Sequence, residues 1–414
     1  MIKYNIKTRT KLLVLFIIIF ELSFVSNTCI AQWIQTSNPN GGTVNTLVAS
    51  GYNLFAGTHA GGIFKTTNDG NNWTTNNIGL SNLNVVSLAI IGLNIFAGTY
   101  GGGIFLSTNN GYGWIEVNNG LSNMYVNAII ASGANIYAGT NIGVFMTSNN
   151  GASWSLLNNG LTNLSVLSFA ITETCIYAGT FSSGVFLSTN NGDSWVAMNE
   201  GLTNTFVYSL AVSGANIFAG TYGGGVFMSS NNGSNWFNIN MGMTNKYVMA
   251  LVVSGSNLFA GTLNGIFLST NNGTNWIQKN QGINPVQAFY CFSIKDNFIF
   301  TGAQYGSIWR RSLTEIIGIQ NISTEMSSTY SLSQNYPNPF NPTTTIKFVL
   351  ARKGKASIII LDMLGKEIAK LVNEFLNAGT YTVDWNASDF PSGVYFCRLQ
   401  TEDYKETKRI VLVK

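Results

Sequence analysis

Few residues in the longest part of this chain could do acid–base, nucleophilic or metal chemistry. His59 is the only histidine, so neither a histidine-rich metal site nor a Ser-His-Asp triad has much to draw on. Glycoside hydrolysis needs two carboxylates about 5 to 9.5 Å apart. The acids between residues 33 and 309 are Asp69, Glu116, Glu173, Asp193, Glu200 and Asp296. They form no evident pair, so we predict no catalytic residue, no cofactor and no metal site.

The cysteines point to no chemistry either. If Cys29 is removed with a signal peptide, Cys175, Cys291 and Cys397 remain. Three is an odd number, and none of them has the spacing of a metal site or a CxxC motif. Each lies in an apolar, strand-like run, which favours a buried small hydrophobic residue. Export would permit a disulfide, but the sequence does not require one.

The elements that would have to position a site come from an internal repeat. A phrase such as Ser107-Thr108-Asn109-Asn110-Gly111-Tyr112-Gly113-Trp114 recurs six times. Its tryptophans stand 40 or 41 residues apart, at Trp73, Trp114, Trp154, Trp195, Trp236 and Trp276. A period of about 40 to 45 residues with several strands per unit is typical of a β-propeller. One unit contains four strand-like pieces, at 85–91, 94–99, 103–107 and 114–117, separated by Gly- and Asn-rich turns.

A second motif gives an independent count of the units. Ala-Gly-Thr begins at Ala56, Ala97, Ala138, Ala178, Ala219 and Ala260, and Thr301-Gly302-Ala303 is a degenerate seventh copy. The last unit lacks its fourth strand, which Trp33-Ile34-Gln35 can supply from the other end of the chain. We therefore predict an all-β fold with a seven-bladed β-propeller at residues 32–313, closed by its N-terminal strand so that no sheet edge stays exposed.

The turn phrase resembles the Asp box of sialidase-like (BNR) propellers, Ser-x-Asp-x-Gly-x-x-Trp, over about residues 33–313. Asparagine occupies the Asp position, at Asn68, Asn109, Asn149, Asn190, Asn231 and Asn271. The box is a structural device, so the resemblance implies the fold and not the activity. Sialidases hold a carboxylate with three arginines, whereas no arginine lies between Trp33 and Trp309. Propellers similar to the photosystem II assembly factor share the repeat type, but their arginine-rich face is absent as well.

Residues that vary among the units are candidates for ligand binding. Those after the Ala-Gly-Thr segment are His59, Tyr100, Asn141, Phe181, Tyr222 and Leu263. Those in the loops between units are Asn84, Tyr125, Ser165, Phe206, Tyr247 and Gln287. Both loops share one face of a propeller, so His59, Tyr100, Tyr125, Phe181, Phe206, Tyr222 and Tyr247 would form a rim. Exposed aromatic rings suit stacking on sugars or packing against a protein. Alternatively, some rings fill gaps between blades and the others vary freely.

The N-terminus has the pattern of a secretory signal peptide, residues 1–31. Lys3, Lys7, Arg9 and Lys11 precede an apolar run at 12–20 that is too short to span a membrane. Cleavage after Ala31 is plausible, and a lipoprotein attached through Cys29 is the alternative. The net charge of +4 is small for 414 residues, and no basic tract suggests a nucleic-acid partner.

The composition changes after residue 313. Residues 314–329 lack the repeat and are interpreted as a linker. Residues 330–414 are richer in charge and contain five strand-like runs, at 345–350, 356–361, 379–385, 393–400 and 408–413, which predict a small β-sandwich. Its opening motif is Asn335, Tyr336, Pro337, Asn338, Pro339, Phe340, Asn341 and Pro342. This motif, with Asp362-Met363-Leu364-Gly365 and Ser392-Gly393-Val394-Tyr395, closely resembles the type A sorting domain of the type IX secretion system. A plain adhesive β-sandwich is the alternative.

That resemblance implies a Bacteroidetes-like host, Sec export, and passage across the outer membrane with the secretion machinery as partner. The domain is typically cleaved, and the cargo is then released or anchored to surface lipopolysaccharide. This anchor would be the only link between the protein and a membrane. We therefore predict a secreted or surface-attached, non-catalytic protein whose propeller binds glycan or protein. A glycoside-processing enzyme and a purely structural surface protein remain the alternatives.

Overall fold

The structure is a computed structural model that describes residues 32–254, 257–296, 298–313, 316, 320–323, 329–388 and 390–414. The expected signal peptide lies outside these ranges. The described residues form nine four-stranded antiparallel sheets, seven of them between residues 34 and 312. One short 3₁₀ turn, η1 (Gln304–Gly306), lies in the last of the seven.

Six of the seven sheets use four consecutive strands each. These sheets are β2–β5 (Val44–Ser50, Asn53–Thr58, Ile63–Thr66, Thr74–Thr75), β6–β9 (Val85–Ile91, Asn94–Thr99, Gly103–Ser107, Ile115–Glu116), β10–β13 (Val126–Ser132, Asn135–Thr140, Gly143–Thr147, Ser155–Leu156), β14–β17 (Val166–Ile171, Ile176–Thr180, Val185–Ser188, Val196–Ala197), β18–β21 (Val207–Ser213, Asn216–Thr221, Gly225–Ser229, Phe237–Asn238) and β22–β25 (Val248–Ser254, Asn257–Thr262, Gly265–Ser269, Ile277–Gln278). We call these, together with the seventh, the repeat sheets.

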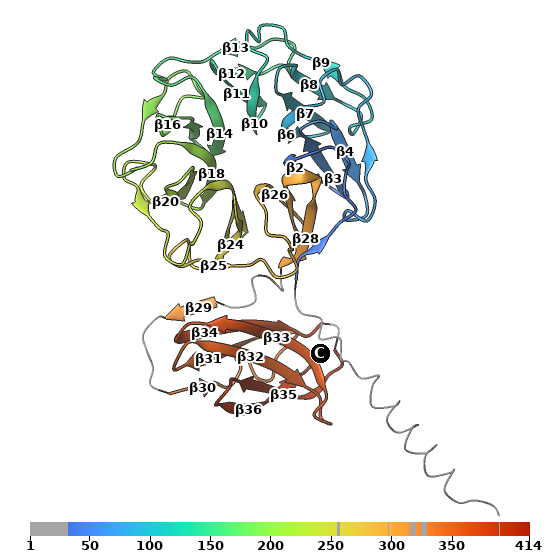
Figure 1. Cartoon of the computed structure of the whole chain (residues 1–414), viewed down its shortest axis with the longest axis vertical. Coiled ribbons are helices and arrows are strands. Elements are labelled where there is room, and N and C mark those ends of the chain that lie inside the picture. Colours follow the sequence, from blue (N-terminus) through green and yellow to red (C-terminus); the bar gives the residue numbers. More distant parts are fainter. Residues whose placement is uncertain are drawn as a thin grey trace, which may run out of the picture. The chain divides into compact units, whose positions relative to one another are not determined.

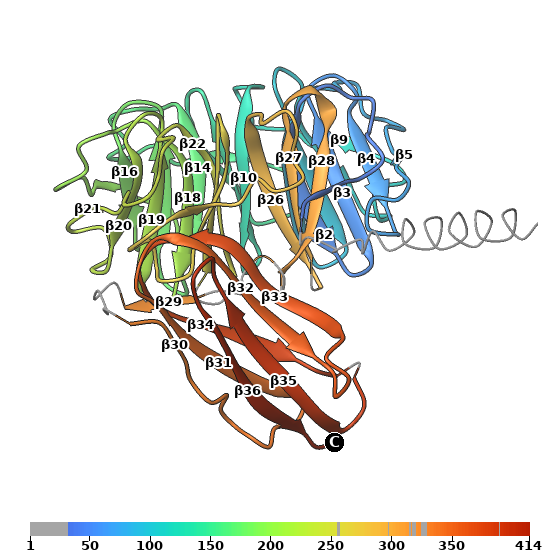
Figure 2. The ribbon, with the colours of Figure 1, turned by 60° about the horizontal axis from the view of Figure 1, so that its bottom comes forward.

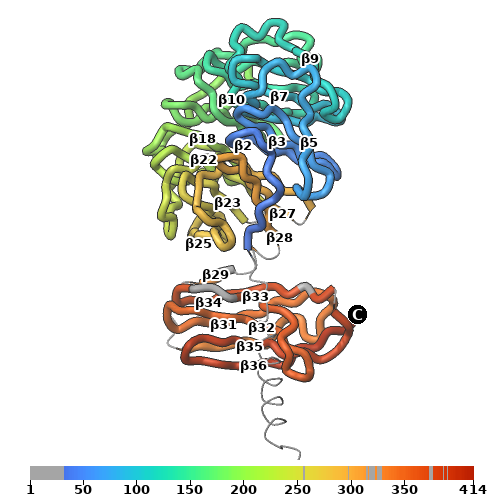
Figure 3. The backbone as a smooth tube through the Cα atoms, turned by 45° about the vertical axis from the view of Figure 1, so that its right-hand side comes forward, coloured from blue at the N-terminus to red at the C-terminus, as the bar shows by residue number. Residues whose placement is uncertain are grey.

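The seventh repeat sheet joins the two ends of this region. It contains β26 (Phe289–Lys295), β27 (Phe298–Ala303) and β28 (Ile308–Ser312), and its fourth strand is β1 (Ile34–Gln35). Ile34 is opposite Arg310 and Gln35 is opposite Trp309. Figure 3 shows the first described residues, in blue, beside β28. The first strands of neighbouring sheets contact one another, and β26 contacts β2, so the sheets close into a ring (Figure 1).

The core of the ring lies between neighbouring repeat sheets. Phe96 and Ile104 of one sheet, for example, share a cluster with Val126 and Phe145 of the next. Phe96 is completely buried, and burial of such a side chain contributes about 1.5–3 kcal/mol. Apolar residues on both faces of the central strands therefore hold the sheets together in sequence around the ring.

The turn phrase follows the third strand of a repeat sheet and is held by its first asparagine. Asn109 Oδ1 accepts hydrogen bonds from Ser107 Oγ and from the Gly113 N–H, both at 2.9 Å. Asn110 and Gly111 have φ values of 60° and 81°, in the left-handed region, which asparagine and glycine tolerate best. The same bonds form at Asn68, Asn149, Asn190, Asn231 and Asn271. The amide oxygen thus closes the turn without a carboxylate.

The C-terminal region contains the other two sheets, seen from a second direction in Figure 2. One has the order β29-β34-β31-β30 and the other β33-β32-β35-β36. The strands are β29 (Gln320–Ser323), β30 (Ser331–Leu332), β31 (Thr343–Leu350), β32 (Gly354–Leu361), β33 (Glu367–Leu376), β34 (Gly379–Asn386), β35 (Gly393–Gln400) and β36 (Lys405–Leu412). Side chains of both sheets share one hydrophobic cluster, which includes Phe348, Ile358 and Trp385.

Three strands of this region were not predicted from the sequence, and the shortest of them is β30. β29 lies within the segment interpreted as a linker, yet it pairs with β34. β33 was not expected at all, although it is the longest strand of the domain. Its pairing with β32 is interrupted at Ile358/Ile359 and at Ile360/Leu361. Such bulges break the two-residue alternation that identifies a strand in a sequence.

Candidate ligand-binding rim

The predicted rim residues lie at the same end of the repeat sheets. Each follows the second strand of a sheet or precedes the first, and the two loops are joined by backbone hydrogen bonds. Tyr222 N donates to Phe206 O at 3.0 Å and Phe181 N donates to Ser165 O at 3.0 Å. His59 N makes the equivalent bond to Thr43 O at 2.9 Å. The backbone therefore presents these side chains together, next to the innermost strands.

Six of the seven candidates form three aromatic pairs between neighbouring sheets, and we call these six rings the aromatic rim. The pairs are Tyr100–Tyr125, Phe181–Phe206 and Tyr222–Tyr247. Their ring centroids are 4.8 or 4.9 Å apart and their planes meet at 70° to 73°. Such edge-to-face pairs contribute about 0.5–1.5 kcal/mol beyond burial. The pairs also hold each ring in place, so a ligand would meet a preorganised surface.

The rim stays open to solvent despite this pairing. Tyr100 is 48% exposed and Phe206, the most covered of the six, is 36% exposed. The rings therefore do not simply fill gaps between sheets. Two pairs, Phe181–Phe206 and Tyr222–Tyr247, follow one another over three adjacent sheets and form a continuous arc. Tyr100–Tyr125 stands apart from this arc, and His59 is exposed and joins no aromatic pair among the described residues.

One predicted equivalence is wrong. Ala288, rather than Gln287, holds the rim position of the last sheet, because Ala288 O accepts from Gln304 N just as Tyr247 O accepts from Leu263 N. The loop before β26 is one residue longer than its counterpart before β22. An alignment without this insertion is shifted by one residue.

Sequence reasoning missed a second set of residues beside the rim. The first strand of every repeat sheet has a bulge after its first residue. The bulged residues are Asn45, Val86, Asn127, Leu167, Tyr208, Met249 and Tyr290. They vary in type, whereas the residue before each of them is always valine or phenylalanine, and that variation was a signal in the sequence. Bulges often redirect side chains toward functional sites.

Tyr208 extends the aromatic arc. Its ring centroid lies 5.5 Å from that of Tyr222. Burial raises the pKa of Tyr208, and Tyr222 raises it further. The same two causes, with Tyr305, raise the pKa of Tyr290. Both phenols therefore stay neutral at physiological pH and act as hydrogen-bond donors or acceptors rather than as charges.

Three of the six acidic residues bond to other side chains. Asp69 and Asp296 both pair with Lys295, at 2.8 and 2.9 Å. Glu116 is exposed and accepts a hydrogen bond from Asn118. No group of three or more metal-ligating side chains occurs among the residues that the structure describes.

The opening motif of the C-terminal domain is anchored at both ends. The Asn335 amide donates to Pro337 O at 3.0 Å and to Thr344 Oγ1 at 2.9 Å. Phe340 is buried, and its backbone bonds to Val411 and Val413 of the C-terminal segment. Tyr336, Pro337, Asn338, Pro339 and Asn341 are exposed between and beside these anchors, whereas Pro342 is half-buried. The motif thus forms a fixed, solvent-facing loop on the domain.

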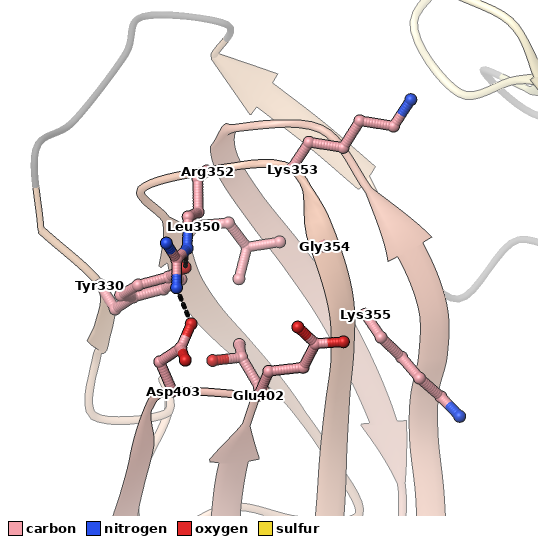
Figure 4. Close-up of a pocket in the computed structure, with 9 residues that line it drawn as sticks. Tyr330, Leu350, Arg352, Lys353, Gly354, Lys355, Glu402 and Asp403 are labelled. Atoms are coloured by element: carbon pink, nitrogen blue, oxygen red, sulfur yellow. Dashed lines mark hydrogen bonds and ion pairs between the residues drawn. The ribbon is translucent and has the colours of Figure 1, made fainter.

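The same domain has a small cavity at one end of its strands (Figure 4). Arg352 pairs there with Asp403 and donates to the Tyr330 hydroxyl at 3.2 Å. The cavity volume is about 20 Å³, which is enough for about one water molecule. We therefore do not regard it as a ligand site.

Comparison with known proteins identifies the C-terminal domain. Residues 334–414 match the family described as Secretion system C-terminal sorting domain. That match indicates export by type IX secretion to the cell surface or beyond. No helix in the described parts of the chain is long and apolar enough to cross a membrane. No curated protein matches the chain.

Solved structures resemble the chain in fold. PorZ, described as an essential bacterial surface component of the type-IX secretion system of Porphyromonas gingivalis, is 16% identical with a TM-score of 0.56. The match covers 91% of this chain but only 60% of PorZ. YCF48 bound to D1 peptide is 16% identical with a TM-score of 0.55, over 68% of this chain and 96% of that one. The WD40 propeller of Doa1 is 11% identical with a TM-score of 0.55, and the match covers 68% of this chain and 97% of the Doa1 domain structure. The ring of sheets is thus an all-β, propeller-like fold.

Proposed function

We propose that this protein is an exported, non-catalytic binding protein whose aromatic rim recognises a glycan or a protein. In this proposal the repeat sheets are the seven blades of a propeller that β1 closes. Their turns are an asparagine version of the Asp box, and the C-terminal sheets form a β-sandwich. The observation that carries the binding function is the set of exposed edge-to-face pairs on one face of the ring.

The chemistry of the rim favours ligands with apolar faces and hydroxyl or amide groups. Tyr222 and Tyr247 offer both ring faces and phenol groups, while Phe181 and Phe206 are purely apolar. Aromatic side chains bury large areas and lose little conformational entropy, which suits them to sugars and to protein partners alike. Lys246, beside Tyr247, is exposed and is the one positive charge in that loop.

The export route is the second part of the proposal. Residues 1–31 would direct Sec export from a Bacteroidetes-like cell, and the sorting domain would engage the type IX machinery. Its exposed loop at Tyr336 is suited to that contact, since Tyr336 is 82% exposed. The propeller would then be released or anchored to surface lipopolysaccharide.

The test of binding uses the purified full chain on a glycan array and, in parallel, cross-linking of the exported protein on intact cells of a type IX-secreting host. Tyr222→Ala should abolish the signal, because it removes one ring of a pair and uncovers Tyr208. Tyr52→Ala is the matched control, because Tyr52 is 86% exposed in the hairpin at the opposite end of its sheet. A glycan hit lost only in Tyr222→Ala supports a lectin-like rim, and a cross-link with the same pattern supports a protein partner. If both experiments are negative with folded protein, the rim is not a binding site.

Export is tested separately, by measuring how much of the chain reaches the medium or the cell surface. Tyr336→Ala should reduce secretion while the domain stays folded, because this side chain contributes little to the core. Leu364→Ala is the control, since Leu364 is 94% exposed in another loop of the same domain. Equal secretion of both variants would show that the machinery does not read Tyr336.

A further inference from the structure

Each junction between neighbouring repeat sheets contains a tryptophan, and six of these seven are held in the same way. Their indole Nε1 donates to a backbone carbonyl of the preceding sheet at 2.6 to 2.9 Å. Their backbone N–H donates to the loop that follows that sheet, at 2.7 to 2.9 Å. All six are at most 5% exposed. They are Trp33, Trp114, Trp154, Trp195, Trp236 and Trp276.

Trp73, at the junction where the ring closes, is the exception. It is half-buried, and its Nε1 has only a long contact of 3.4 Å with Thr36 Oγ1. No corresponding bond joins its backbone N–H to the described residues of the preceding loop. The indole Nε1–H and the backbone N–H of Trp73 therefore lack the bonds that the six other tryptophans make, and its ring is accessible.

The preceding loop explains the difference. At the six other junctions an apolar residue of that loop shares a buried cluster with the tryptophan. These residues are Leu80, Leu121, Leu161, Leu202, Met243 and Ile283. Before Trp73 the loop reads Ser37-Asn38-Pro39-Asn40, and between Trp33 and Val44 it is one residue shorter than its counterpart between Trp73 and Val85. This loop contributes no leucine, isoleucine or methionine to the cluster against which Trp73 packs, so a space remains.

That space is a pocket of about 490 Å³, within the range of about 300–1,000 Å³ typical of small-molecule sites. Its apolar walls are Phe64, Pro39 and the ring of Trp73. Its polar walls include the amides of Asn40 and Asn72, whose side chains bond to no other described residue. No ionisable side chain lines it. We call it the closure pocket.

We propose that the closure pocket is a binding site for a neutral saccharide of one or two rings, separate from the aromatic rim. A sugar ring offers an apolar face for the indole and hydroxyl groups for the amides. Because the lining carries no charge, an anionic or cationic ligand is disfavoured. No charged side chain in the pocket would offset the free energy needed to remove water from such a ligand. An extended peptide would need a long free strand edge, whereas the outer strand here, β5, has two residues.

The experiment titrates the full chain with maltose, cellobiose, lactose and N,N′-diacetylchitobiose by calorimetry. At least one should bind saturably with a dissociation constant in the millimolar range or tighter. Asn72→Ser should weaken that binding about tenfold. Serine occupies the same position before Trp154 and Trp195, so the turn tolerates it. Trp73→Leu should abolish binding.

Asn235→Ser is the matched control, because Asn235 precedes Trp236 at a junction that is filled. It should leave the affinity unchanged, and so should Tyr222→Ala, which alters only the rim. The proposal is overturned if none of the four disaccharides binds at up to about 10 mM, if Asn235→Ser weakens binding as much as Asn72→Ser, or if glucuronate binds where the neutral sugars do not.

Discussion

A buried lysine links the two ends of the ring, and its contribution to stability can be measured. Lys295 is 7% exposed and its Nζ lies 2.8 Å from Asp69 Oδ1 and 2.9 Å from Asp296 Oδ2. Asp69 belongs to the first repeat sheet and Lys295 to the last, so the pair bridges the two ends of the ring. The perturbation is Asp69→Asn. Five other repeats have asparagine at this left-handed position, with φ of 53° to 60°, so the backbone accepts the change.

The expected loss follows from how far each partner is buried. Breaking a fully buried ion pair costs about 3–5 kcal/mol, and an exposed pair contributes about 0–1 kcal/mol. Here the lysine is buried, but Asp69 is 34% exposed and Asp296 remains beside the ammonium. Solvent therefore screens part of the interaction. We expect Asp69→Asn to lower the free energy of unfolding by about 1–2 kcal/mol.

The assay is chemical denaturation of the full chain followed by tryptophan fluorescence, since eight of the nine tryptophans lie in the ring. Asp193→Asn removes the same charge from an exposed turn position and should change stability by less than about 0.5 kcal/mol. Lys295→Ser introduces the residue found at this position in four other repeats and completes a double-mutant cycle. A coupling energy below about 0.3 kcal/mol would refute the reasoning.

The ion pair between Lys295 and Asp69 also predicts how the free energy of unfolding depends on pH. The hydrogen bond that Lys295 donates to Asp69 raises the pKa of Lys295, burial lowers it, and the hydrogen bond to Asp296 raises it further. Because this pKa is raised in the folded state, the ion pair makes its full contribution to the free energy of unfolding at pH values below the ordinary lysine pKa of about 10.4. That contribution is lost as the pH rises through the raised pKa. The stability gap between the natural chain and Asp69→Asn should therefore be constant from pH 7 to 9 and narrow above about pH 10.5.

Two further predictions use matched positions. An added Cβ at Gly79, where φ is +82°, would lie 2.1 Å from the carbonyl oxygen of Trp114, whereas Gly92, at φ +57°, faces open space. Gly79→Ala should cost at least about 3 kcal/mol and Gly92→Ala about 1–2 kcal/mol, and similar denaturation midpoints for the two variants would contradict the packing. Burial raises the pKa of Cys291 to about 12, and thiols react as thiolates. A maleimide at pH 7.5 should therefore label half-buried Cys175 in the native protein and Cys291 only after unfolding, and equal native labelling in mass spectra would argue against this burial.

Local patterns allowed much of the fold to be predicted. The repeat, its turn phrase and its strands depend on residues that are close in sequence, and the structure has four-stranded sheets at the predicted places. The place of β1 beside β28 could be predicted because Trp33-Ile34-Gln35 matches Trp276-Ile277-Gln278. β33 escaped prediction because bulges in its pairing with β32 disturb the alternation.

The candidate sites were only partly predictable. The sequence placed aromatic residues in two loops of each repeat, but whether rings from different repeats meet depends on the rotation between neighbouring sheets. The edge-to-face pairs and the bulged Tyr208 beside them follow from that rotation. Gln287 was wrongly assigned to the rim because the loop before β26 has one extra residue. The other repeats are so regular that this insertion is easily overlooked in the sequence.

By itself, the sequence determined the repeating unit, because short strands, asparagine turns and glycines act over a few residues. It also determined the kind of C-terminal domain, whose motif is continuous in the chain. Only the tertiary structure decided what happens where the ring closes. Lys295 meets Asp69 across 226 residues, and Trp73 keeps an open pocket because the loop before it is short and polar. Both features depend on bringing the chain's distant segments together, which no local pattern encodes.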